Sequence, residues 1–452
     1  EKLKLSKNFD LEIKRTDINL NYFDYTAANG KRYVLDKNDI RSSLNDILVS
    51  KTSENTTAWL ANLSQLSLRN LVFDSVGKSN DRIRIHSGAV KNISLSSKSI
   101  KNLKDLLTPG RNLEINNVSG RFEGKENHTN FKNNNLTIDS LHFIPFQSLA
   151  DYKIKKAFNE DFFQLKSGMI TASGVDLANF PNDSSIKIKD VRTKDLRIIT
   201  LKDKSQPKLH HKIKHLPTRI ISDIPAKIEI ENLYSDDMYV EYQEVSEKEK
   251  KESIFPVEKM SLDVKNIKTS NPTATDSLYI IASFKVFDLV PVILNIKESY
   301  QDSLKGFLMK INTLPVRLND LNETLFPLTG VKVKSGSLDS LNLDVSGNDD
   351  YATGKSRMYY RNVKIQIFNQ KDRQKQSLLN KMISGIANTF IIGKNKKGKV
   401  YPLFFERVKT KSFVNYYIKT ALNGILSGLG LPGAKDKQRK YLKNYPDVKL
   451  IQ

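Results

Sequence analysis

A basic, glycine-containing stretch near the C-terminus comes closest to a nucleotide-binding motif. Gly393 and the pair Gly398-Lys399 have the spacing of a phosphate-binding loop. That motif also requires a preceding strand and, directly after the lysine, a serine or threonine that binds magnesium. Here Val400 follows the lysine, and the preceding residues have helical spacing. We therefore interpret the stretch as a basic turn and expect no cofactor.

Three histidines are the strongest candidates for metal ligands. His210, His211 and His215 lie close together, and the last two have a spacing at which a helix could chelate zinc. Three lysines are interspersed among them and would repel a cation, and prolines lie on both sides of the stretch. We therefore expect a solvent-exposed linker from Lys202 to Pro217 and no metal site.

The acidic residues do not form a recognisable catalytic motif. Pairs such as Asp236-Asp237 and Asp349-Asp350 stand where turns are expected, and aspartate is common in turns. No Gly-x-Ser-x-Gly elbow occurs. We predict no catalytic residue and no enzymatic activity. A carbohydrate-active or other enzyme is a third hypothesis, because folding can pair carboxylates that are distant in sequence.

The composition excludes several classes of protein and narrows the choice of partner. The 452 residues contain no cysteine, which excludes disulfide scaffolds, thiolate metal sites and cysteine nucleophiles. The net charge is +23, but the lysines are scattered and lack the interleaved aromatics of a nucleic-acid groove. We predict no nucleic-acid partner and favour attraction to a membrane surface or simple solubility. No segment approaches the ~20 consecutive apolar residues of a membrane span.

Apolar and polar residues alternate with a period of two in many short runs. Such runs, bounded by Asn, Asp, Gly or Ser, indicate strands with one apolar and one solvated face. Antiparallel sheets can leave one face to water, whereas parallel sheets rarely do. Clear examples are Ile83 and Ile85, Leu136 and Ile138, Met238, Val240 and Tyr242, and Leu341, Leu343 and Val345.

One short motif recurs along the chain, with apolar residues at i, i+2 and i+5 and Asn or Asp at i+4. In a regular strand, the residue at i+5 would face the wrong side. An inserted residue, a β-bulge, would restore the face, and Asn or Asp tolerates the backbone that a bulge can require. A strand end followed by a turn explains a single copy equally well. Copies begin at Leu66, Leu113, Ile186, Ile228, Leu262 and Met358.

Helical spacing is rarer and is concentrated near the C-terminus. Two amphipathic helices are expected, over Gln376–Ile392 and Phe413–Leu429, and a lysine-rich tail begins at Ala434. These helices either pack on the sheet or face a membrane or a protein partner through an apolar side. The residues of that side are Leu379, Met382, Ile383, Ile386, Phe390, Phe413, Tyr417, Leu422 and Ile425. Short connecting helices are expected at Ser43–Leu48, Thr56–Leu63, Ile100–Leu107 and Ser148–Phe158.

These patterns predict a mainly β fold. We expect a long, twisted and curled sheet of antiparallel type that forms an apolar groove, with short connecting helices and two amphipathic C-terminal helices. Four regions are expected. They are an N-terminal β-rich groove segment (1–218), a C-terminal β region (219–375), an amphipathic helical segment (376–431) and a basic tail (432–452).

The stretch from about Ile228 to Leu429 resembles the C-terminal region of AsmA-like proteins, which are related to the TamB-type envelope proteins. The order of several loose motifs carries the resemblance. They are Ile228 to Tyr242, Phe255 to Ile267, Gly306 to Met309, Leu318-Asn319, Leu325 to Leu328, Val333 to Leu343, Gly347-Asn348, Ala352, Gly354, Tyr359 to Val363, Leu379 to Ile391, Arg407 and Phe413 to Tyr416.

The resemblance implies a periplasmic protein, with an inner-membrane anchor in an N-terminal segment that this chain lacks. It also implies a groove that shelters or transfers phospholipid, or another acyl lipid, without catalysis. An alternative is an assembly factor that binds an envelope protein through its sheet edge or C-terminal helices. Alternation alone leaves open whether the apolar residues line a lipid groove or an ordinary dry core. The candidate lining residues are Ile228, Ile230, Met238, Val240, Tyr242, Leu262, Val264, Leu341, Leu343, Val345, Ile365 and Ile367.

Overall fold

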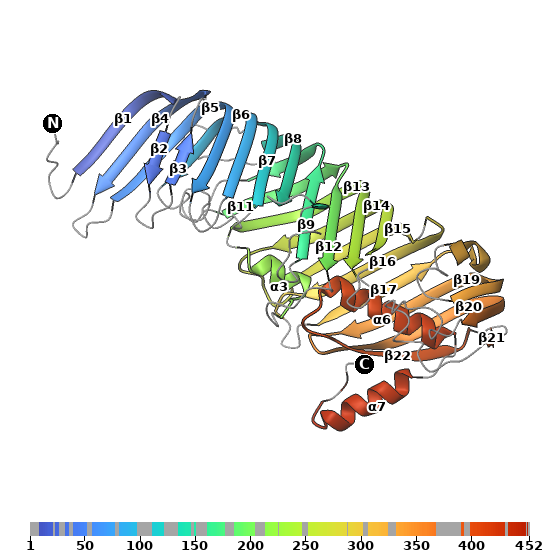
Figure 1. Ribbon diagram of the computed structural model, residues 1–452. Helices are drawn as coiled ribbons and strands as arrows, with labels where there is room; N and C mark the ends of the chain where they lie inside the picture. Colours follow the sequence, from blue (N-terminus) through green and yellow to red (C-terminus); the bar gives the residue numbers. More distant parts are fainter. Residues whose placement is uncertain are drawn as a thin grey trace.

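All the described strands belong to one sheet, which runs the length of an elongated molecule (Figure 1). This confirms the mainly β fold that the alternation predicts. The computed structural model describes residues 9–20, 23–26, 32–35, 39–51, 57–76, 81–96, 111–121, 134–145, 149–150, 161–176, 185–203, 213–224, 226–245, 252–286, 288–301, 306–323, 331–367, 390–392, 398–429, 433–448 and 450.

The N-terminal half of the sheet comprises the first twelve strands. Its strands are β1 (Phe9–Leu20), β2 (Phe23–Thr26), β3 (Arg32–Leu35), β4 (Asp39–Lys51), β5 (Thr57–Val76), β6 (Asp81–Ser96), β7 (Arg111–Arg121), β8 (Asn134–Pro145), β9 (Asp161–Ser167), β10 (Ile170–Val175), β11 (Ser185–Lys194) and β12 (Arg197–Asp203).

The C-terminal half continues the sheet and adds the helices. Its strands are β13 (Lys227–Val245), β14 (Glu252–Lys268), β15 (Ser277–Val286), β16 (Val290–Ser299), β17 (Phe307–Thr313), β18 (Val316–Arg317), β19 (Val331–Gly347), β20 (Tyr351–Ile367), β21 (Phe390–Ile392) and β22 (Val400–Glu406). Its helices are α3 (Pro217–Ser222), the 3₁₀ helix η2 (Leu318–Leu321), α6 (Phe413–Gly428) and α7 (Ala434–Asn444).

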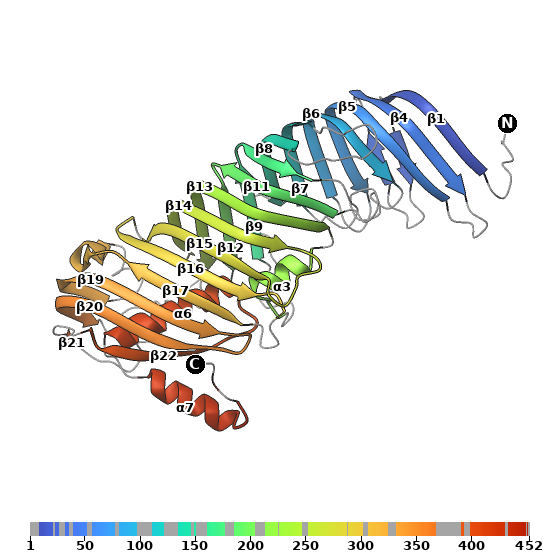
Figure 2. The ribbon, with the colours of Figure 1, turned by 180° about the vertical axis from the view of Figure 1, so that it is seen from behind.

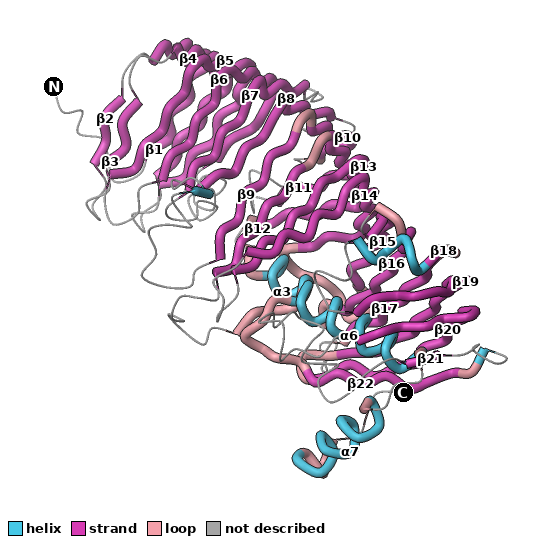
Figure 3. The backbone as a smooth tube through the Cα atoms, turned by 45° about the vertical axis from the view of Figure 1, so that its right-hand side comes forward, coloured by secondary structure: helices cyan, strands magenta, loops and turns pink. Residues whose placement is uncertain are grey.

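Strand order in space follows the chain almost throughout. Strands β4 to β8 each pair with the next, β1 pairs with β4, and β8 pairs with both β9 and β10. Strands β11 and β12 then both pair with β13, and the sequence of neighbours continues through β17, β19 and β20 to β22. The views from behind and from the side show the same curved array, with the labelled helices at its C-terminal end (Figures 2 and 3).

Most neighbouring strands are antiparallel, but two junctions are parallel. Strand β6 is parallel to β7, and β11 and β12 are parallel to β13. Parallel neighbours require a long crossover connection, and the chain supplies one at 97–110 and another at 204–226. The second crossover contains α3. Because β11 and β12 pair with β13 across this crossover, the sheet is continuous where the sequence suggested a boundary between two regions near residue 218.

The short helices expected in the N-terminal half differ from the structure where it describes them. Ser43–Leu48 lies in β4, and most of Thr56–Leu63 lies in β5, so both predictions are wrong. The register between these strands shifts between Ser43 and Leu44 and again between Asn45 and Leu48. Such shifts break the two-residue period and create apolar spacings that imitate a helix. Ile100–Leu107 lies outside the described residues, as does Ser148–Phe158 except for the helical residues 149–150.

The recurring motif corresponds to kinks in the strands at two of its copies. Asn266 and Asn362 have φ angles of 59° and 51°, in the left-handed region that Asn tolerates. At Asn362 the register between β19 and β20 shifts, as a bulge requires. At Asp190 and Asn232, by contrast, the parallel register continues unbroken from one strand to the next.

Strand register places apolar residues in rows that cross the sheet. Residues directly opposite each other on neighbouring strands point to the same side, so each row identifies one face. One row contains Ala172, Val191, Leu233, Val264, Ile280, Ile296, Met309 and Val345. Beside it runs a second row of Ile170, Thr193, Ser235, Leu262, Ala282, Leu294, Ile311 and Leu343. We call the side of the sheet that carries these two rows the inner face and the opposite side the outer face.

Candidate functional site

Helix α6 covers the C-terminal end of the inner face. It contacts β19, β20 and β22. A Cβ atom added to Gly424 would lie only 2.7 Å from Cδ2 of Leu343 and 3.2 Å from Cδ2 of Leu403, so the glycine permits the helix to approach the sheet closely. The Ser412 side chain accepts a hydrogen bond from the Asn415 backbone at 3.3 Å and caps the helix N-terminus.

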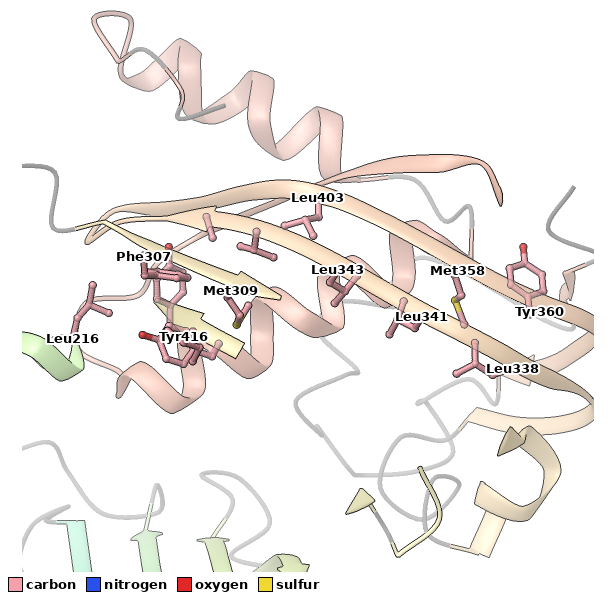
Figure 4. Packing of buried hydrophobic residues seen from close by; sticks show 14 of the residues in the cluster. Leu216, Phe307, Met309, Leu338, Leu341, Leu343, Met358, Tyr360, Leu403 and Tyr416 are labelled. Carbon is pink, nitrogen blue, oxygen red and sulfur yellow. The ribbon is translucent and has the colours of Figure 1, made fainter. Parts of the chain in front are cut away.

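Aromatic rings fill the space between the start of α6 and the sheet (Figure 4). The Phe307 ring packs edge-on against Tyr416 and Tyr417, with centroid distances of 5.7 and 5.0 Å. All three residues are buried together with Leu343 and Met309. This end of the inner face is therefore a close-packed core with no room for a ligand.

A buried carboxylate joins α3, α6 and the sheet. Glu298, on β16, accepts hydrogen bonds from the backbone and hydroxyl of Thr218 at 3.0 and 2.5 Å, and one from the Tyr417 hydroxyl at 3.3 Å. Burial raises the pKa of Glu298, and the hydrogen bonds from Thr218 act against that rise. Because its bonds connect three elements, we assign Glu298 a structural role at this end of the sheet.

A buried arginine ties the chain segment before α3 to the end of the sheet. The Arg407 guanidinium donates hydrogen bonds to the carboxylate of Asp349 and to the backbone carbonyl of Lys214, and its side chain is 1% exposed. Its central carbon also lies 5.5 Å from the centre of the Tyr416 ring, within the range of a cation–π contact. Arg407 is therefore part of the core.

Away from α6, the inner face remains apolar but is only half-buried. Leu233, Leu262, Val264 and Ile280 are all partly accessible, although each belongs to a row that continues into the core. Helix α3 reaches β14 and β16 but is only six residues long. Among the described side chains, the apolar surface over β13, β14 and β15 is thus a part of the inner face that a ligand can contact.

The structure divides the candidate lining residues into three groups. Leu341, Leu343 and Val345 are core residues, with exposures of 2%, 1% and 4%. Met238 is also buried. The backbones of Ile365 and Ile367 lie in β20, but their side chains are outside the described set. The half-buried candidates are Ile228, Ile230, Val240, Tyr242, Leu262 and Val264.

The second expected amphipathic helix is present as α6. The prediction for the first helix is wrong at its C-terminal end, which is a strand. Phe413, Tyr417 and Ile425 of α6 pack on the core. Of the two alternatives for this apolar side, the structure therefore has it packed on the sheet and not facing a membrane. Leu422 is half-buried. Phe390 lies in β21 and not in a helix, because Phe390–Ile392 pairs with β20. The other candidates of the first helix, Leu379, Met382, Ile383 and Ile386, lie outside the described residues.

The lysine-rich tail forms a helix that covers the other side of the same strands. Tyr441 of α7 packs against Tyr351 and Phe404, at centroid distances of 5.3 Å each. These two residues alternate with Ala352 and Leu403 of the inner core and therefore lie on the outer face. The end of the sheet is thus enclosed between α6 and α7, and the lysines of α7 are exposed.

The outer face carries both exposed apolar side chains and a small hollow with charged residues in its lining. Tyr279, Ile281 and Ile293 on this face are each 40% exposed. The hollow, of about 240 Å³, is lined by Asp195, Arg197, Asp237, Met238, Tyr239, Glu258 and Lys259. Its lining contains the carboxylates of Asp195, Asp237 and Glu258.

Within the described part of the chain, no three His, Asp or Glu side chains gather closely enough to hold a metal ion. His215 is half-buried before α3, whereas His210 and His211 lie outside the described residues. None of the described helices combines the length and the hydropathy required to cross a membrane.

Sequence patterns missed several residues of the inner face. Ile280 and Leu294 belong to it through strand register, which a single sequence does not reveal. Thr193 and Ser235 were missed because a hydroxyl in an alternating run is usually assigned to the solvated face.

No family model matches the chain, and no curated protein matches it.

Proposed function

We propose that this chain binds acyl lipid, such as phospholipid, on its inner face, as a non-catalytic lipid-handling protein of a bacterial cell envelope. The observation that carries the proposal is the pair of apolar rows. They begin in the packed core under α6 and continue across β15, β14 and β13, where Ile280, Val264, Leu262 and Leu233 are half-buried. The sequence resemblance to AsmA-like proteins supports the same function and a periplasmic location.

The dimensions and energetics of the inner face suit an acyl chain. Strands are about 4.8 Å apart, so a chain lying along a row would cross several strands and contact an apolar residue on each. Each buried CH₂ group contributes about 0.8 kcal/mol, so burying even half of a ~16-carbon chain yields ~6 kcal/mol. The net charge of +23 would draw the protein toward anionic membrane surfaces.

Adjacent residues on β15 provide a matched test. Ile280 is half-buried on the inner face, and its neighbour Ile281 is 40% exposed on the outer face. We expect Ile280→Glu to remove phospholipid that co-purifies with the protein, because the glutamate places a charge in the path of the acyl chain. Ile281→Glu should leave the bound lipid unchanged. Native mass spectrometry with lipid extraction measures both variants, and circular dichroism verifies that they are folded.

Two results would count against the proposal. Wild-type protein that carries no phospholipid, even after incubation with phospholipid vesicles, would remove its basis. Equal lipid content in the folded Ile280→Glu and Ile281→Glu variants would show that lipid binds elsewhere on the chain.

An envelope assembly factor is the second candidate function, and the edge of the sheet favours it. Strand β1 pairs with β4 alone among the described strands, and a free strand edge can add a strand from a partner. The apolar side of α6 is already used within the core, which makes β1 the better candidate surface. This function predicts a lipid-free protein that forms a stable complex with an envelope protein and loses it when 9–20 is deleted.

A further inference from the structure

Two hydroxyl side chains interrupt the second apolar row near the middle of the sheet. Thr193 on β11 and Ser235 on β13 are direct partners in the parallel register. Ile170 continues the row on one side of the pair and Leu262 on the other. The two hydroxyls are thus neighbours on the inner face, with an apolar residue on either side of them along the row.

Neither hydroxyl has a hydrogen-bond partner in the part of the chain that the structure describes. The oxygens of Thr193 and Ser235 are both inaccessible and unpaired, and Ser235 is only 1% exposed. Buried polar groups in proteins are nearly always hydrogen-bonded, because an unpaired one retains its full desolvation cost. Two adjacent unpaired hydroxyls therefore indicate a group that is supplied by a ligand.

The surroundings identify the chemical character of that group. The charged neighbours in sequence, Arg192 and Lys194 beside Thr193 and Asp236 beside Ser235, are exposed and alternate to the outer face. Arg192 in fact lies over the ring of Tyr234, 4.5 Å from its centre. With these charges directed away, the hydroxyls suit a neutral acceptor better than a carboxylate or a phosphate.

We propose that Thr193 and Ser235 form a subsite that donates hydrogen bonds to an ester carbonyl of a bound acyl lipid. This subsite rests on the proposed function. It fixes the position of the lipid, because the acyl chain then extends from the carbonyl along the apolar rows toward α6. The accessible part of that path, from β13 to β15, crosses two strand spacings, about 10 Å in all, and ends where α6 covers the packed core. One acyl chain spans about 15 Å of a bilayer, so this path would hold most of its length.

The test compares a diacyl phospholipid with its dialkyl ether analogue, which has the same chains and head group but no ester carbonyl. Purified full-length protein is incubated with equimolar mixed micelles of the two lipids, and native mass spectrometry measures the ratio bound. We expect the wild type to prefer the ester about fivefold or more, the effect of one or two net hydrogen bonds. The double variant Thr193→Val/Ser235→Ala should bind the two lipids equally.

A matched control separates this effect from general damage. Ser283 is exposed on the outer face, and Ser283→Ala should retain the wild-type preference. The double variant should remain folded, because replacing unpaired buried hydroxyls with apolar groups is close to neutral.

Each alternative outcome is distinguishable. Equal binding of both lipids by the wild type, or an ester preference that survives in the double variant, would overturn the subsite and leave the proposed function intact. Binding of neither lipid by the wild type would overturn both.

Discussion

Shortening Leu343 should detach α6 from the inner face. Leu343 is 1% exposed, and its two terminal methyl carbons lie 2.7 and 3.1 Å from the position of a Cβ on Gly424. Leu343→Ala removes apolar atoms and leaves a cavity between two rigid elements, and such changes cost about 2–5 kcal/mol. Because the site is fully buried and the helix backbone is too close to collapse further, we expect about 3–4 kcal/mol.

The matched control is Leu308→Ala on the neighbouring strand β17. Leu308 is 52% exposed on the outer face, so its loss should cost less than about 1 kcal/mol. Urea unfolding followed by circular dichroism measures both variants, and hydrogen exchange shows whether protection is lost first in α6. Equal costs for the two variants, or a cost below about 1 kcal/mol for Leu343→Ala, would refute the packing described here.

Three further changes test other contacts. Arg407→Ala should cost about 3–5 kcal/mol in urea unfolding because it breaks a buried ion pair, whereas Arg361→Ala, at an exposed pair, should cost less than about 1 kcal/mol. Burial raises the pKa of Glu298, so the contribution of this group to wild-type stability should be fully present below its ordinary pKa of 4.5 and be lost as pH rises through the raised value. Glu298→Gln should flatten that part of the curve of stability against pH. Gly424→Leu should destabilise the protein by several kcal/mol and expose α6 to proteolysis, because the new side chain overlaps Leu343.

Local patterns predicted the strands of the C-terminal half well. Leu262 and Val264 alternate as expected, and the motif that ends at Ile267 contains Asn266 with a positive φ angle. Alternation is a property of each strand, so one sequence is enough to reveal it. The apolar spacing in α6 was equally clear, because a whole helix repeats it.

Features that depend on contacts between distant segments could not be predicted. Whether Leu343 lines a groove or lies under a helix depends on where α6 docks, 80 residues later in the chain. The parallel register that pairs Thr193 with Ser235 depends on a crossover connection whose path the sequence does not specify. Helix α7 was missed because its side chains are mostly charged, and a single residue, Tyr441, carries most of its packing.

Photo-crosslinking with a phospholipid that carries a diazirine on its acyl chain tests the central claim most directly. After irradiation and digestion, mass spectrometry locates the modified residues. If acyl chains lie along the inner face, the crosslinks will fall on Leu233, Leu262, Val264 and Ile280, which are half-buried there. Crosslinks concentrated on Ile281 and Ile293 of the outer face, or no crosslinks at all, would contradict the account.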